Sequence, residues 1–142
     1  MNPNYNKTIT LYNCLKAKDA GGDKDIWQRT VLSPCFFKAK ITEIQSGTEA
    51  RKVNTYTVRI PEDGRYLPYR DWKALPEEER KLFYTLSEGD LVVSGECMEE
   101  ITGKSPGTAA QLLSRYQPEA FRITAITNNT SHRMGKHYKV GG

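Results

Sequence analysis

The chain has 142 residues, a mass of 16.1 kDa, 37% hydrophobic residues and a formal net charge of +4. A chain of this length can bury roughly 68% of its unfolded surface, which predicts one domain over residues 1–142 and argues against a long disordered polymer. No run approaches the ~18 apolar residues of a membrane span and no apolar secretory segment opens the chain, so we expect a soluble, cytoplasmic protein without membrane contact.

Short segments of alternating polar and apolar residues predict β-strands along most of the chain. In the clearest segment, Cys35 and Phe37 share one face while Phe36 and Lys38 share the other. We predict seven strands, over residues 8–15, 26–32, 35–44, 53–60, 91–97, 121–127 and 137–140.

The pair Ser33-Pro34 separates the second predicted strand from the third. Because proline cannot donate a hydrogen bond to a strand ladder, this pair predicts a turn, and the two strands should form a hairpin. The expected fold is therefore mainly β, a small single-domain barrel of about seven strands with one or two short helices and extended basic segments at both ends.

Residues 75–86 form the clearest predicted helix. Pro76 suits the first helical position, and the acids at positions 77–79 complement the positive end of the helix dipole. One packed stripe should then contain Leu75, Leu82, Phe83 and Leu86. A second short helix is predicted over residues 108–116 with Thr108 as its cap, and residues 18–24 and 45–51 are the expected loops.

The charges divide the chain into three parts. Residues 1–18 hold three lysines and no acid, residues 19–119 hold 14 basic and all 17 acidic residues, and residues 120–142 hold four basic residues and no acid. Basic ends and an acidic middle suit head-to-tail contact between identical subunits, and the ends could also contact DNA. A solvated surface without a partner explains the same pattern.

The segment RYLPYRDWK, residues 65–73, interleaves aromatic and basic residues. Such a segment could stack on single-stranded nucleic acid or anchor a protein interface. Alternatively, an extended loop packs Tyr66, Tyr69 and Trp72 into the core.

No residue pattern predicts catalysis or a cofactor. His132 and His137 lie five residues apart without a neighbouring Cys or acid, so we expect no metal site. Cys14, Cys35 and Cys97 form no C-x-x-C pair and should be reduced and buried. The sequence contains no phosphate-binding glycine motif, and helix dipole and solvation account for its Glu clusters. We therefore predict no enzymatic activity.

Five stretches of the sequence resemble a family of small, functionally unassigned proteins. They are TITLYN, DIWQRTVLSPCFF, VRIPEDGRYLPYRDWK, TLSEGDLVVSGE and FRITAITNNTSHRMGKHYKVGG. The family is encoded by tailed phages and prophages of Firmicutes, near genes for the capsid and the head-to-tail connector. One departure is Tyr138, where the family ending has Trp.

The resemblance implies a virion structural protein of the neck, of the head-closure, adaptor or tail-completion type. Such a protein acts by forming a homo-oligomeric ring. The implied partners are portal, adaptor or tail proteins and packaged DNA, and the implied locations are the host cytoplasm during assembly and the virion.

Two other functions stay open: an OB-like nucleic-acid-binding module and a phage inhibitor of a host defence protein. The expected protein or DNA contact residues are polar groups near the C-terminus and two aromatic residues. These are Arg133, Lys136, His137, Lys139, Arg122, Tyr69 and Trp72.

Overall fold

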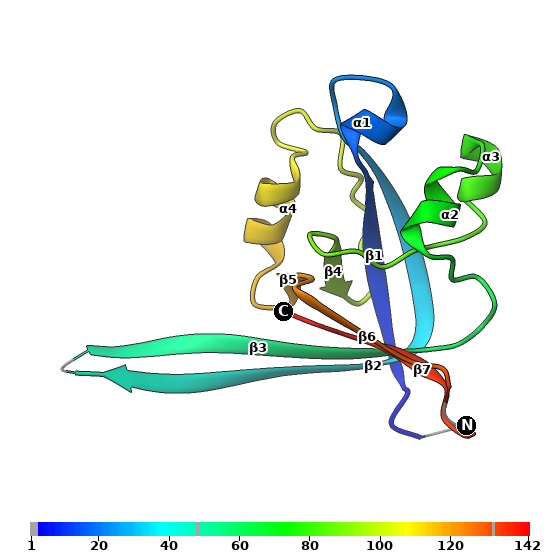
Figure 1. The fold of residues 1–142 in the computed structure, drawn as a ribbon. Helices are drawn as coiled ribbons and strands as arrows, with labels where there is room; N and C mark the ends of the chain where they lie inside the picture. Colours follow the sequence, from blue (N-terminus) through cyan, green and yellow to red (C-terminus); the bar gives the residue numbers. More distant parts are fainter. Residues whose placement is uncertain (1–2, 48, 132) are drawn as a thin grey trace.

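The computed structural model describes residues 3–47, 49–131 and 133–142, and its framework is a sheet of seven antiparallel strands (Figure 1). The strands are β1 (Lys7–Leu15), β2 (Ile26–Ser46), β3 (Glu49–Pro61), β4 (Leu91–Ser94), β5 (Ala120–Arg122), β6 (Ala125–Asn129) and β7 (His137–Gly141). Their order across the sheet is β5-β4-β1-β2-β3-β7-β6. The prediction of a mainly β protein is confirmed.

The long strand β2 belongs to both halves of this sheet. Its first part pairs with β1 as far as Cys35, and its second part pairs with β3 from Phe36 onward. We call β5, β4, β1 and the first part of β2 half-sheet A, and the rest of β2 with β3, β7 and β6 half-sheet B. The predicted hairpin at Ser33-Pro34 is wrong, because both residues lie inside β2 at the point where it changes partner. There a missing N–H costs no ladder hydrogen bond.

The two half-sheets curl around one apolar core but do not close into the expected barrel. β5 and β6 are the two ends of the strand order, and no ladder joins them. The core between the half-sheets includes fully buried Leu11, Val58 and Val140, and it also holds the stacked rings of Tyr56 and Phe121. The fold is therefore a curled half-barrel.

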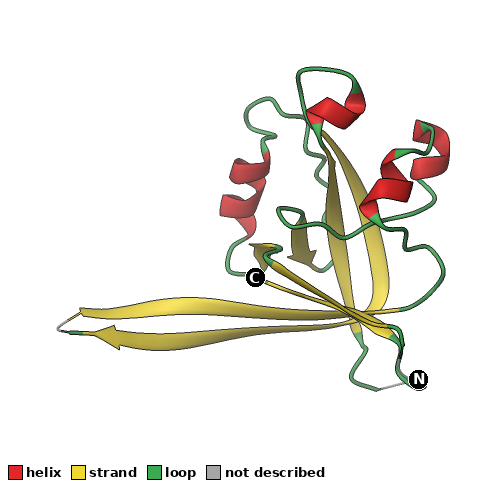
Figure 2. Ribbon diagram, in the orientation of Figure 1, coloured by secondary structure: helices red, strands yellow, loops and turns green. Residues whose placement is uncertain are grey.

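Short helices surround half-sheet A, as Figure 2 shows. They are α1 (Ala17–Ala20), α2 (Tyr69–Lys73), α3 (Glu77–Arg80) and α4 (Ala109–Tyr116). α4 packs Leu112 into a second apolar cluster with Leu91 and Val93 of β4. Thr108 accepts a hydrogen bond from the backbone N–H of Gln111 in a capping box, so the predicted helix and its cap are confirmed.

The predicted helix over residues 75–86 is only partly correct. α3 covers a single turn, and Leu82 is 68% exposed and not packed. The chain leaves the helical path because Tyr84 makes backbone hydrogen bonds with Arg65 and Leu67. These bonds draw residues 83–86 into the core as extended chain, and Leu86 is buried there.

Both terminal segments are strands within the sheet. β1 lies between β4 and β2, and β7 lies between β3 and β6. Cys14, Cys35 and Cys97 are free and buried, as predicted. Burial raises the pKa of the Cys14 thiol to about 11 and that of Cys35 to about 12. In the described part of the chain, no helix is long and apolar enough to span a bilayer.

Candidate interaction surfaces

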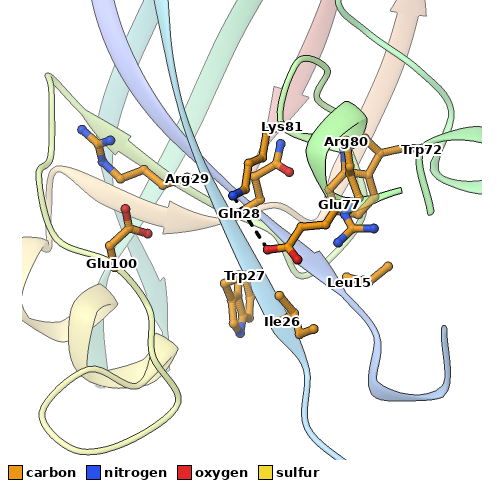
Figure 3. Close-up of a pocket in the computed structure, with 10 residues that line it drawn as sticks. All are labelled: Leu15, Ile26, Trp27, Gln28, Arg29, Trp72, Glu77, Arg80, Lys81 and Glu100. Carbon is orange, nitrogen blue, oxygen red and sulfur yellow. Dashed lines mark ion pairs between the residues drawn. The ribbon is translucent and has the colours of Figure 1, made fainter. Parts of the chain in front are cut away.

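A cleft of about 400 Å³ opens between the start of β2 and the helices α2 and α3 (Figure 3). Its apolar lining comes from Leu15, Ile26, Trp27 and Trp72. Charged groups surround this lining: Arg29 and Glu100 on one side, and Glu77, Arg80 and Lys81 of the α3 region on the other.

The charged groups of the cleft are largely bound to the protein itself. Arg29 donates to the carbonyl oxygen of Cys97, Arg80 donates to that of Leu75 at 3.0 Å, and Lys81 Nζ lies 3.8 Å from Glu77 Oε1. No histidine, cysteine or serine lines the cleft. The described residues also contain no cluster of three potential metal ligands. The titratable groups of the cleft are thus the carboxylates Glu77 and Glu100 and the cations Arg29, Arg80 and Lys81.

Tyr69 and Trp72, two of the predicted contact residues, lie in α2 beside this cleft and make contacts within the subunit. Trp72 is fully buried, so the core-packing alternative for it is the one that the structure supports. The Tyr69 hydroxyl donates to Asp19 at 2.7 Å, and this bond fastens α1 to α2. Lys73 adds an ion pair with the same carboxylate, and together these contacts lower the pKa of Asp19.

The predicted contact residues of the C-terminal region lie in separate places. Arg122 belongs to half-sheet A, where it donates to the carbonyl oxygen of Gly89 at 3.1 Å. Arg133 and Lys136 are exposed in the turn between β6 and β7, and His132 lies outside the described residues. Their role as contact groups stays a prediction.

His137 stabilises the turn between β6 and β7. Its Nδ1 lies 2.6 Å from the carbonyl oxygen of Gly135, and its Nε2 lies 3.1 Å from Asn129 Nδ2. A neutral ring that donates from Nδ1 and accepts at Nε2 satisfies both contacts. The imidazole is thus bonded within the protein at both nitrogens.

Lys139 is part of a basic face that the sequence analysis did not identify. The face is the outer surface of half-sheet B, opposite the core. Lys38 on β2, Arg59 on β3 and Lys139 on β7 project from it, because Phe36 pairs with Arg59 and Arg59 pairs with Lys139. Lys40 lies two residues beyond Lys38 on the same side of β2. We call these four residues the basic face.

The basic face has no acidic partner among the described residues. None of its four cations forms an ion pair with a described carboxylate. Neutral polar positions surround them, including Thr57 and Thr127. Arg59 also lies over the ring of Phe36, with Cζ 5.0 Å from the centroid. The face therefore carries four positive charges from three adjacent strands.

The second distinctive surface is the far part of the β2–β3 hairpin, which projects from the body as a two-stranded arm (Figure 1). We define the arm as residues 38–55. At about 3.4 Å per residue, its nine β2 residues, 38–46, span about 30 Å. Gly47 at the tip has a φ of +67°, a left-handed conformation that favours glycine.

Both long edges of the arm lack a neighbouring strand in the described structure. β2 pairs with nothing but β3 from Phe36 onward, and β3 meets β7 only from Thr57. No described side chain of the arm is buried, and Ile41 is 64% exposed. Ile41 lies on the face that continues the core, but it lies beyond the core's end.

A loop of opposite charge follows β4. Glu96 and Glu100 are exposed there, and Met98 between them is 73% exposed. Glu99 is bound to Arg115, with 2.9 Å between the charged groups. We call residues 95–100 the acidic loop. It is one exposed acidic part of the middle of the sequence, and residues 77–79 of α3 are another.

A family model matches residues 4–142, and the family is described as one of unknown function (DUF6751). No curated protein and no solved structure matches the chain.

Proposed function

The chain belongs to the DUF6751 family, whose function is unknown. From the arm and the acidic loop we propose that the protein is a structural subunit, which acts by assembling with copies of itself into a ring. The projecting arm is the joint between neighbouring subunits. In this proposal the protein carries out no reaction and needs no cofactor.

The observation that carries this proposal is the arm's pair of unpaired edges. A two-stranded hairpin is only marginally stable alone in water, and open strand edges pair readily with other chains. Each described residue at positions 38–41 is exposed, so the arm gains no support from its own body. A neighbouring subunit would supply the missing contacts, including backbone hydrogen bonds to a free edge.

A ring follows from the asymmetry of such a contact. The arm of one subunit would bind a different surface of the next, which is a heterologous interface. Interfaces of this kind close into rings when the rotation between subunits allows it. The charge distribution of the chain suits a heterologous interface, because a basic surface of one subunit can contact an acidic surface of the next.

The acidic loop is the surface of the neighbour that best matches the arm. The arm sequence contains four basic residues, Lys38, Lys40, Arg51 and Lys52, against the two acids Glu43 and Glu49. The loop presents Glu96 and Glu100 with the exposed thioether of Met98 between them. Opposite charge would set the register, and Met98 would bury apolar surface.

The position of the ring in a virion rests on the sequence resemblance. We place it in the neck of a tailed phage, where it would bind portal, adaptor or tail proteins. The protein would then occur in the host cytoplasm during assembly and in the finished particle.

Shortening the arm tests the assembly. Lys40 faces Thr55 across the hairpin, so residues 41–54 can be replaced by Asn-Gly, the sequence of a two-residue hairpin turn. The unmodified protein should sediment as an oligomer of defined size and form rings in electron micrographs. The shortened protein should sediment as a single subunit at every concentration.

The body provides the control for this comparison. No described side chain of residues 41–54 is buried, so the circular dichroism and cooperative melting of the body should persist in the shortened protein. The proposal is wrong if the unmodified protein is strictly monomeric, alone and with candidate neck proteins, or if the shortened protein still forms the same rings.

A further inference from the structure

We infer that the basic face of half-sheet B binds the phosphate backbone of duplex DNA. The inference goes beyond assembly, because one subunit carries all four cations. It also differs from the sequence-based expectation, which placed DNA contact at the chain ends and not on Lys38, Lys40 and Arg59.

The first argument is the position of the charges. Lys38, Arg59 and Lys139 come from three neighbouring strands, which lie about 4.8 Å apart in a sheet. Lys40 extends this row by about 7 Å along β2, at about 3.4 Å per residue. Duplex DNA carries one negative charge per about 1.7 Å of its axis, so a patch of this size faces several phosphates at once.

The second argument is that these cations have no competing partner among the described residues. Some exposed cations elsewhere pair with acids, as Arg65 does with Asp63 and Arg115 with Glu99, whereas no such pair is formed by the four cations of the basic face with the described acids. On the basic face the intervening positions are neutral, and Thr57 and Thr127 offer hydroxyl groups that can donate to phosphate oxygens. Such a surface attracts a polyanion, because no described acid on it would repel the phosphates.

The third argument concerns the kind of nucleic acid. Single-strand binding proteins stack bases on exposed aromatic rings. Among the described residues, the outer face of half-sheet B has one Phe, Tyr or Trp ring, that of Phe36, and the Arg59 guanidinium lies over it. The His137 ring on the same face is hydrogen-bonded at both nitrogens within the turn. Tyr56 and Tyr138 point to the core, where both are buried. Contacts to phosphates without base stacking therefore favour duplex DNA and give no sequence preference.

The test is the salt dependence of binding to a fluorescently labelled random-sequence duplex, measured by anisotropy. Four phosphate contacts predict a slope of about −3.6 for log affinity against log salt. Affinity should then fall about 150-fold between 50 and 200 mM salt. A single strand of the same length should bind no more tightly than the duplex.

Two double variants identify the surface. Lys38→Gln with Lys40→Gln, and separately Arg59→Gln with Lys139→Gln, should each reduce the slope to about −1.8. The matched control is Lys18→Gln with Lys24→Gln, which removes the same charge from exposed positions in and after α1. The control should leave the slope near its original value.

Sedimentation of the same variants separates DNA binding from assembly. The Arg59→Gln with Lys139→Gln variant and the control should sediment as the unmodified protein does, whether or not that protein forms a ring. Lys38 and Lys40 also belong to the arm, so their variant should weaken assembly as well as DNA binding. The inference is overturned if the duplex does not bind at 50 mM salt, if the control lowers the slope as much as the other variants, or if a single strand binds more tightly. It is also overturned if the Arg59→Gln with Lys139→Gln variant changes sedimentation but not DNA affinity, because the face would then contact protein.

Discussion

Asp90 is a buried carboxylate that joins β1 to the turn before β4. It is 1% exposed, and it accepts hydrogen bonds from Asn13 Nδ2 at 2.8 Å and from the backbone N–H groups of Cys14 and Ser87 at 3.0 Å. Burial raises the pKa of Asp90 to about 6, against the opposing effect of these donors and Lys16. The folded protein therefore holds this proton more tightly than the unfolded chain does.

This shift predicts how stability depends on pH. Between the ordinary Asp pKa of about 3.9 and the folded value of about 6, the folded state binds more protons than the unfolded state. The contribution of Asp90 is thus fully present below about pH 4 and is lost as the pH rises through 6. At 1.36 kcal/mol per pH unit, the loss is about 3 kcal/mol.

The variant Asp90→Asn isolates this contribution, because it does not titrate. We expect the free energy of unfolding of the unmodified protein, minus that of the variant, to decrease by about 2 kcal/mol from pH 4 to pH 7, since the unfolded Asp is already half ionised at pH 4. Urea unfolding at several pH values measures it. A difference that increases with pH would mean that the three donors outweigh burial and lower the pKa of Asp90.

Residue patterns predicted the burial of particular side chains, whereas the functional expectations stay predictions. The three cysteines are buried as expected, and the core alternative for Trp72 is the one that the structure supports. Trp72 was also a candidate contact residue, because the sequence alone cannot distinguish an exposed ring beside basic residues from a buried one. The basic residue that contacts the Trp72 ring is Arg80 of the same subunit, with its guanidinium carbon 5.6 Å from the ring centroid. An aromatic residue near basic residues in the sequence can therefore be part of the protein's own packing.

At the scale of elements, the exposed side chain of Ile41 indicates that the arm has a binding partner. It lies opposite Asn54 on the face of β2 that carries Phe37 into the core, but it is 64% exposed because the body ends before it. An apolar side chain in this position would be covered by a neighbouring subunit. Covering most of it would contribute about 1–2 kcal/mol to each contact.

The variant Ile41→Thr tests this expectation while keeping a β-branched residue. Affinity between subunits should fall about tenfold, since 1.4 kcal/mol is a factor of ten. The melting of the separate subunit should change by less than about 0.5 kcal/mol. Ile26→Thr is the control, because Ile26 is 49% exposed beside the cleft and away from the arm. Equal effects from both variants would contradict a specific role for Ile41.

Alternation predicted most strands, but not their connections. β1 and β7 are nearly as expected, whereas Pro34 suggested a break within β2 that the structure does not have. A proline excludes a ladder hydrogen bond only where a partner strand is present, and at Pro34 the partner changes from β1 to β3. α2 was missed because five residues give too little periodicity. Conversely, the predicted strand over residues 121–127 bends into β5 and β6.

At the scale of the whole molecule, the sequence analysis anticipated mixed charge but placed the contacts at the chain ends. The structure puts both terminal segments into the sheet and projects the middle of the chain instead. Lys38, Arg59 and Lys139 are far apart in sequence, and only the strand register brings them to one face. A single sequence does not fix that register, so the basic face could not be predicted.

The central claim is that the arm becomes covered when subunits assemble. Hydrogen exchange of the assembled protein, compared with the same protein diluted until it sediments as a single subunit, measures this directly. We predict that assembly slows the exchange of amides in residues 38–46 and 49–55, whose outward N–H groups have no partner within the described subunit. Amides of α1 should exchange equally in both states. Rings that form while the arm continues to exchange at the rate of the free subunit would contradict the claim.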